Sequence, residues 1–203
     1  EEEQIKAIKG ALALRPQVEK IIDKLYTKKF DAVYYLGIGG TYASSMQAVT
    51  YMNGKSNLPV FVQHAAEYYT TGNKRLTKDS IVVVSSVTGT TQEVVKAVEE
   101  IKKVGATLIG FIDKAESKLS QLCDFVVTYP APGTEQIKFF MVADRLMYLH
   151  GEFEDYSEYY EQLEHYLPTG LVEAEKKADA FGLSFAEKHR RDSMHYFIGA
   201  GNQ

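Results

Sequence analysis

The segment DSIVVVSSVTGTTQE, residues 79–93, constrains the fold of this chain more than any other. Its four consecutive apolar residues, 81–84, are β-branched and predict a strand that is buried on both faces. From Thr91 to Val104 the apolar residues recur at helical spacing, so the segment predicts a strand, a short loop and a helix. Thr90 and Glu93 fit a capping box, which is expected to start this helix.

The loop between this strand and this helix has the composition of an anion site. It carries hydroxyl residues and a glycine, and the helix N-terminus behind it offers unpaired N–H groups and a partial positive charge. Residues 85–93 include no Lys or Arg, so neutral donors would hold a phosphate. An ordinary turn whose Ser and Thr residues cap the helix explains the same pattern, and the local sequence leaves both interpretations open.

The rest of the chain predicts an α/β fold. Residues 1–29 are expected to form an N-terminal helix with a break near Arg15 and Pro16. Strands are expected at residues 32–36, 60–63, 81–84, 106–112 and 125–128, with helices between them. This alternation is typical of a five-stranded parallel sheet with helices on both faces, a flavodoxin-like three-layer sandwich. A helical segment is expected after it, with helices at residues 136–150, 156–166 and 172–189.

A second glycine-rich loop, residues 37–45, follows the first strand and leads into a helix. Its glycines let a ligand approach the backbone, and Thr41 and Ser44 can donate hydrogen bonds to it. It is no dinucleotide fingerprint, because Tyr42 stands at the third glycine position, and it lacks the Gly-Lys-Ser/Thr of a P-loop, so no cofactor is predicted. Ligands bind at the carboxyl ends of strands in such sheets, so both loops are expected to face one crevice.

Composition excludes several classes of protein. The 203 residues include a single cysteine, Cys123, which rules out internal disulfides and fits a reducing cytoplasm. The formal net charge of −4, with signs interspersed, argues against nucleic acid as a partner. No apolar run approaches the roughly 18 residues that span a bilayer. A cytoplasmic protein without a membrane partner is therefore expected.

The five histidines give weak signals. His64 and His195 lie at predicted strand boundaries, and His150 and His189 close predicted helices, where a cation is favoured by the dipole. No two of them have metal-ligand spacing with a nearby carboxylate or thiol, so no metal is predicted.

Tyrosines recur along one face of the helix expected at residues 156–166. Such a stripe is more often packing or an oligomer contact than a ligand site. The helices after Thr134 present further apolar faces, which a soluble monomer rarely leaves uncovered, so a homo-oligomer is predicted.

The end of the chain resembles its first strand and loop. The sequence FIGAG at residues 197–201 matches YLGIG at residues 35–39, an offset of 199 − 37 = 162 positions. A repeat this long indicates a duplicated domain. Residues 194–203 are therefore interpreted as the start of a second, incomplete domain, and the chain as a fragment; a chance match over five residues is the alternative.

Two motifs resemble a known family. The Gly-x-Gly-Gly-Thr-Tyr-x-Ser of residues 37–44 and the Ser-x-Thr-Gly-x-Thr of residues 86–91 resemble the sugar isomerase (SIS) domain of phosphosugar enzymes. The resemblance implies a phosphosugar-binding SIS domain at residues 30–150 and a helical linker at 151–193. The chain as a whole is most similar to the fructosamine-6-phosphate deglycase branch.

The resemblance also implies roles for individual residues. Ser86, Thr88 and Thr91 are expected to bind the substrate phosphate together with Thr41. The family pattern has Ser where Thr88 stands, which keeps the donor, whereas Val87 removes a polar side chain and puts any contact there in doubt.

The implied activity is cleavage of a fructosamine 6-phosphate, such as fructoselysine 6-phosphate, into glucose 6-phosphate and an amine. It needs an acid and a base, which in the family come from the second domain, so no catalytic residue is assigned and the chain alone is expected to be inactive. Glu135, at the crevice rim, contacts the sugar or caps a helix, and Glu135 with His64 is the one pairing that could replace the missing groups. An aldose–ketose phosphosugar isomerase and a non-catalytic phosphosugar-sensing module remain alternatives.

Overall fold

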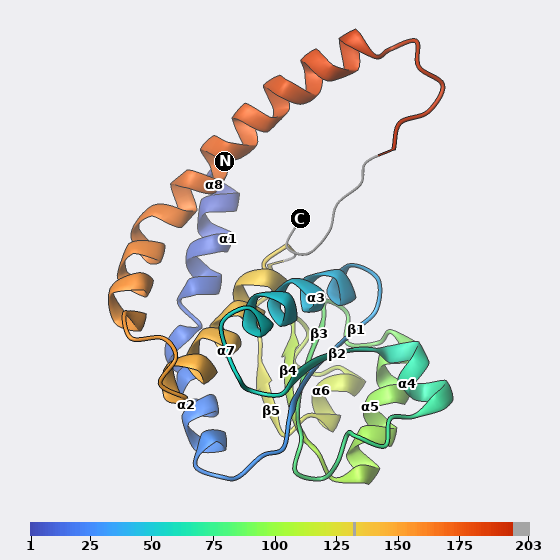
Figure 1. Ribbon diagram of the computed structural model, residues 1–203. Helices are drawn as coiled ribbons and strands as arrows, with labels where there is room; N and C mark the ends of the chain where they lie inside the picture. The colour runs from blue at the N-terminus through green and yellow to red at the C-terminus, as the bar shows by residue number, and fades with distance from the viewer. Residues whose placement is uncertain (132, 197–203) are drawn as a thin grey trace.

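Strand β3 (Ile81–Ser86) lies in the middle of a five-stranded sheet in the computed structural model, which describes residues 1–131 and 133–196 (Figure 1). The strand order is β2-β1-β3-β4-β5, and every neighbouring pair is parallel. The other strands are β1 (Val33–Gly37), β2 (Val60–His64), β4 (Thr107–Ile112) and β5 (Phe125–Val127). The predicted fold class is confirmed.

Each face of the sheet has its own apolar core. Ile81 and Val83 belong to one core, and Val82 and Val84 to the other, because successive side chains of a strand point to opposite faces. The first core includes residues of α2 (Arg15–Tyr26), α3 (Gly40–Asn53) and α7 (Glu135–Leu149). The second includes residues of α4 (Ala65–Thr71), α5 (Gln92–Val104) and α6 (Lys118–Leu122). A run of β-branched residues thus supplies two cores at once.

The N-terminal region forms two helices, α1 (Glu2–Leu12) and α2, with the break at the expected place before Pro16. Helix α8 (Tyr156–Lys188) contacts α1 and extends beyond it (Figure 1). Two helices were predicted at residues 156–166 and 172–189, and this is wrong, since α8 continues through Pro168. Proline removes one intrahelical hydrogen bond, but Pro168 and Val172 are buried, and this packing holds the helix together across the proline.

The tyrosine stripe of α8 divides in two. Tyr156 and Tyr160 are buried in the first core, so for these two residues the packing interpretation is confirmed. Tyr159 and Tyr166 are 38% and 66% exposed. The predicted homo-oligomer and the predicted domain boundaries stay predictions, and the repeat at residues 197–201 lies outside the described residues. No helix in the described part of the chain is long and apolar enough to cross a bilayer.

A buried carboxylate joins three helices. Tyr51 of α3 donates a hydrogen bond to Asp144 Oδ1 of α7 at 2.8 Å, and Tyr160 of α8 donates to Asp144 Oδ2 at 2.8 Å. Burial raises the pKa of Asp144 to about 6, even though both hydrogen bonds favour the ionised form. The carboxylate therefore positions the helices but is costly to ionise.

The cost of ionising the buried Asp144 carboxyl group predicts that the stability of the fold depends on pH. Between about pH 4 and pH 6 the folded chain holds a proton on Asp144 that the unfolded chain has lost, so stability falls as pH rises through this window. The Asp144 contribution to the free energy of unfolding should decrease by on the order of 2–3 kcal/mol across it. Urea titrations of the wild type and Asp144→Asn at several pH values measure this. Asp179→Asn, at an exposed position of α8, is the control, and an Asp144→Asn profile equal to that of the wild type would contradict the assignment.

Candidate functional site

A cavity of about 520 Å³ opens at the carboxyl ends of β1 and β3. Its walls contain backbone and hydroxyl groups from three loops and the beginnings of three helices. It is lined by Ile38, Gly40, Thr41, Ser44, Ser85, Ser86, Val87, Thr88, Thr91, Val94, Gly133, Glu135 and Gln136. All six residues expected to bind substrate, namely Thr41, Ser44, Ser86, Thr88, Thr91 and Glu135, lie on this one cavity, while their roles stay predictions.

The electrostatics of the cavity come from helix ends. Helices α3, α5 and α7 each contribute a residue of their first turn to the lining, Gly40, Val94 and Glu135 respectively. A helix N-terminus carries a partial positive charge and free N–H groups. The lining residues in the described part of the chain include no Lys or Arg. The cavity can therefore attract an anion through backbone dipoles alone.

The start of α5 differs from the predicted capping box. The N-cap is Thr91, whose side chain makes no capping hydrogen bond, and the Thr90 hydroxyl donates to Thr88 Oγ1 at 3.1 Å instead. The predicted capping box is wrong because α5 begins at Gln92. Thr90 therefore lies one residue before the N-cap and does not cap the first turn. In the described structure no side chain caps the first N–H groups of α5, which leaves them available to a ligand.

Ser86 and Thr88 have hydroxyl protons that they do not use within the loop. Ser86 Oγ accepts a hydrogen bond from the Gly89 N–H at 3.0 Å, and Thr88 Oγ1 accepts from the Thr90 N–H at 3.3 Å. A hydroxyl that accepts can still donate its own proton. The Thr91 hydroxyl has no hydrogen-bond partner in the described part of the chain. These three side chains can therefore donate to a phosphate.

The loop after β1, residues 37–45, contributes to the cavity in a different way. The Thr41 hydroxyl accepts from the Ile38 N–H at 3.1 Å and donates to the Ile38 carbonyl at 3.0 Å. Ser44 Oγ donates to the Gly40 carbonyl at 3.1 Å. A hydroxyl has one proton, so both side chains shape the loop and would have to exchange a partner to bind a ligand directly.

Sequence reasoning missed three residues of the lining, Ser85, Gly133 and Gln136. Ser85 is buried as part of β3, which extends two residues further than expected. Its place in the same run of hydroxyl residues as Ser86 was the available signal. No local pattern marked Gly133 or Gln136, because they reach the cavity only through the packing of α7.

The pairing of Glu135 with His64 is not formed at the cavity. Glu135 lines it, and its Oε2 accepts from the Gly133 N–H at 3.1 Å. His64 is absent from the lining, and its ring packs edge-on against Tyr42 with centroids 5.0 Å apart. Glu135 is the only ionisable side chain among the lining residues. The described cavity thus provides one carboxylate and no imidazole.

A buried ion pair stands behind the start of α7. Lys138 Nζ lies 3.4 Å from Asp113 Oδ1 and donates to the Tyr129 carbonyl at 3.3 Å. The two side chains are 1% and 6% exposed. Burial is the main cause that raises the pKa of Asp113, against the opposing effect of Lys138. The pair joins α7 to the end of β4 and so helps to position Glu135 and Gln136.

The thiol of Cys123 takes no part in the cavity. Burial raises its pKa to about 12, so it stays protonated near neutral pH. The Cys123 thiol is therefore a poor nucleophile in the folded chain.

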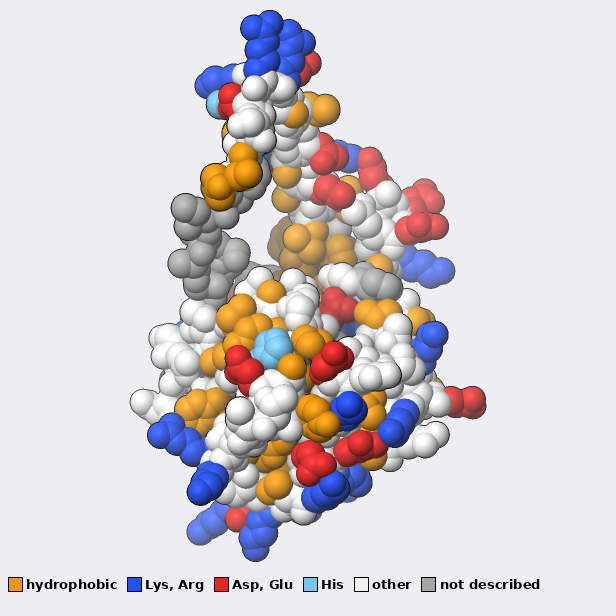
Figure 2. Space-filling model, turned by 90° about the vertical axis from the view of Figure 1, so that its right-hand side faces the viewer, with side chains coloured by type: hydrophobic (Ala, Val, Ile, Leu, Met, Phe, Trp, Pro, Cys, Tyr) orange, Lys and Arg blue, Asp and Glu red, His pale blue; other side chains and the backbone are white. Residues whose placement is uncertain are grey.

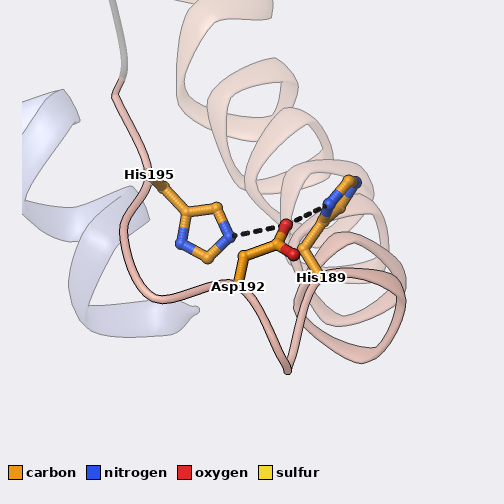
Figure 3. A group of neighbouring side chains, drawn as sticks. All are labelled: His189, Asp192 and His195. Carbon is orange, nitrogen blue, oxygen red and sulfur yellow. Dashed lines mark hydrogen bonds and ion pairs between the residues drawn. The ribbon is translucent and has the colours of Figure 1, made fainter.

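The structure corrects the expectation about histidines. His189, Asp192 and His195 come together after the end of α8 (Figure 3), with His189 Nδ1 at 2.8 Å and His195 Nε2 at 3.7 Å from Asp192 Oδ2. Two histidines therefore do share a carboxylate, and the three donor atoms could hold a metal ion. The same region carries Lys188, Arg190 and Arg191, and Figure 2 shows basic side chains gathered at this end of α8. Their charge repels a divalent cation, and the absence of a metal stays a prediction.

The loop after β3 allows a steric test. Gly89 has a φ of 65°, and a Cβ at this position would collide with Ser117 Oγ, which is held in place because it caps α6. Gly105 also has a positive φ, 94°, but a Cβ there meets only an ordinary contact. We expect Gly105→Ala to cost about 1–2 kcal/mol and Gly89→Ala to cost a further 1–3 kcal/mol or so. Chemical denaturation measures both, and equal costs would show that the loop tolerates a side chain.

These observations define the class of protein. It is an α/β domain with a cavity at the carboxyl ends of its strands, and this cavity offers hydroxyl donors and helix N-termini to an anion. The family model that matches the chain is the SIS domain, over residues 24–145, which is more than half of the sequence. The chain belongs to the SIS domain family, as the motifs of residues 37–44 and 86–91 indicated.

Known relatives agree with this assignment. The chain is 26% identical over 116 residues to the fructoselysine 6-phosphate deglycase of Escherichia coli K12, covering 57% of this chain and 34% of that protein. It is 30% identical over 138 residues to an uncharacterized HTH-type transcriptional regulator of Clostridium perfringens, covering 64% of this chain and 48% of the regulator. The chain thus spans about a third to a half of the length of these relatives.

A solved structure has the same fold. The C-terminal domain of glucosamine-fructose-6-phosphate aminotransferase from Francisella tularensis superposes with a TM-score of 0.74 at 18% sequence identity. The match covers 92% of this chain and 57% of that one. At this identity the similarity shows the fold alone.

Proposed function

We propose that this chain is the phosphosugar-binding part of a deglycase, which cleaves a fructosamine 6-phosphate such as fructoselysine 6-phosphate into glucose 6-phosphate and an amine. The observation that carries the proposal is the set of free donors at one cavity: Ser86, Thr88 and Thr91 next to the uncapped start of α5. The similarity to a fructoselysine 6-phosphate deglycase supports the choice of reaction. We place the protein in the cytoplasm, where it would act as a homo-oligomer.

The reaction requires two proton transfers. A base removes a proton from C1 of the ketoamine, an acid delivers one to C2, and water hydrolyses the resulting imine. Each positioned acid or base contributes about 10²–10⁴-fold. Glu135 is the only ionisable side chain that lines the cavity, so the described residues can hold and orient a substrate but lack a full acid–base pair.

Phosphate should dominate the affinity of the cavity. Glucose 6-phosphate at about one hundred times its Kd should raise the free energy of unfolding by about 2.7 kcal/mol, and free glucose should have no comparable effect. A hydrogen bond to a charged group is worth about 1.5–3 kcal/mol. Removing two donors in Ser86→Ala/Thr88→Ala should therefore weaken binding by at least about a hundredfold in calorimetry.

The control is Thr71→Ala, which removes an exposed hydroxyl on α4, outside the cavity lining. It should bind glucose 6-phosphate like the wild type. Unchanged affinity in the Ser86→Ala/Thr88→Ala variant would mean that the phosphate binds elsewhere.

The 203-residue chain should bind substrate without turning it over. Incubation with fructoselysine 6-phosphate, followed by an enzymatic assay for glucose 6-phosphate, tests this directly. Release at the rate of a full-length deglycase would place the acid and base within the chain, and Glu135→Gln would then identify the carboxylate.

Two alternatives make different predictions. An aldose–ketose isomerase interconverts glucose 6-phosphate and fructose 6-phosphate when its catalytic residues are present, whereas a deglycase requires an amine substituent. The similarity to a transcriptional regulator favours a sensing module as the second candidate. A sensor would bind the phosphosugar and show turnover in no form of the protein, including the full-length one.

A further inference from the structure

A second cavity, of about 540 Å³, adjoins the first. It lies between α1, α8 and the start of α7, and it shares Gly133 and Gln136 with the first cavity. Its lining consists of Gln4, Ala7, Ile8, Gly133, Thr134, Gln136, Ile137, Leu171, Val172 and Glu175. None of the residues assigned to phosphate binding lines it.

The two cavities form a row. Hydroxyl groups of the loop after β3 stand at one end, Gly133 and Gln136 in the middle, and the second cavity beyond them. Gly133 has a φ of 87°, and a Cβ built on it would meet no atom of the described, non-adjacent residues within 4 Å. The chain thus leaves open space at the point where the cavities meet. A ligand with its phosphate on Ser86 and Thr88 can extend across Gly133.

The lining of the second cavity selects for a particular chemistry. Ile8, Ile137 and Val172, from three different helices, form apolar walls. Glu175 is the only charged residue among the described residues of the lining, and its Oε2 accepts a hydrogen bond from the Gln4 amide. A carboxylate has two oxygens and about four acceptor positions, so Glu175 can still accept from a ligand.

The nearby lysine does not cancel this charge. Lys176 is next to Glu175 in sequence, but its Nζ pairs with Glu1 at 3.0 Å and it does not line the cavity. The described lining of this cavity therefore carries one formal charge, the negative charge of Glu175. It is suited to an aliphatic chain that ends in a cation and unsuited to one that ends in an anion.

We propose that this second cavity binds the amine part of the substrate and prefers an aliphatic amine with a terminal ammonium group, which Glu175 accepts. The inference rests on the proposed function, because C1 of the sugar, which carries the amine, is at the opposite end from the 6-phosphate. The methylene groups of such an amine lie against Ile8, Ile137 and Val172, and the ammonium reaches Glu175. Lysine joined to C1 through its α-amino group has this form, because it keeps a flexible four-carbon stem that ends in an ammonium group.

Three synthetic ketoamine 6-phosphates separate the contributions. The amine is cadaverine, which ends in an ammonium group, hexylamine, which ends in a methyl group, or aminohexanoic acid, which ends in a carboxylate. Calorimetry with the 203-residue chain gives the Kd of each, together with that of glucose 6-phosphate. We expect the cadaverine compound to bind most tightly and the aminohexanoic acid compound least tightly, with about two- to fivefold between neighbours, the range of a partly exposed ion pair.

Glu175→Gln should remove the preference for cadaverine over hexylamine and leave the Kd of glucose 6-phosphate unchanged. Glu173→Gln is the matched control, with the same change of charge on an exposed α8 residue outside the cavity, and it should keep the preference. Equal affinities for the three compounds, or a preference that survives Glu175→Gln, would overturn the amine site while glucose 6-phosphate binding upholds the phosphate site. Failure to bind glucose 6-phosphate would overturn the proposed function, and the amine site with it.

Discussion

Burial of β3 on both faces is the constraint on which the rest of this structure depends. All six of its residues are buried, and the alternating side chains of residues 81–84 enter two separate cores. A strand in this position cannot shift by one residue, because the shift would exchange the side chains of the two cores. Its pairing with β1 and β4 then fixes where the neighbouring strands end. The loops after β1 and β3 therefore meet, and the first cavity forms between them.

The proposed anion site would use dipoles where many phosphate sites use side-chain charges. The starts of three helices surround the cavity, and its lining residues include no basic side chain. Lys138 lies close by in sequence to Glu135, but it is buried against Asp113 and adds no net charge. Neutral donors would hold the proposed phosphate without a strong ion pair, which suits a ligand that has to be released. With Glu175 beyond Gly133, the row of cavities would suit the proposed ligand, which has an anion at one end and a cation at the other.

The site was predictable where it depended on local sequence. Ser86, Thr88 and Thr91 follow a strand and precede a helix, so their convergence on the carboxyl edge follows from the alternation of elements. The start of α5 was misplaced by one residue, because the Thr90 hydroxyl bonds to Thr88 Oγ1 and not to the first turn of the helix. Hydrophobic periodicity also predicted two helices where α8 is continuous. Periodicity contains no information on the packing that offsets the hydrogen bond missing at Pro168.

The sequence by itself determined the α/β class, the central strand, the two loops and the family, because each of these depends on residues that are neighbours in the chain. Tertiary structure alone decided what lies across from these loops. Gly133 and Gln136 reach the cavity only because α7 packs against α3, and Glu175 faces Gln4 only because α8 lies along α1. His189, Asp192 and His195 likewise converge through a turn that no helical or strand period describes. Contacts between distant segments depend on shape and packing, which the order of residues encodes only through the whole fold.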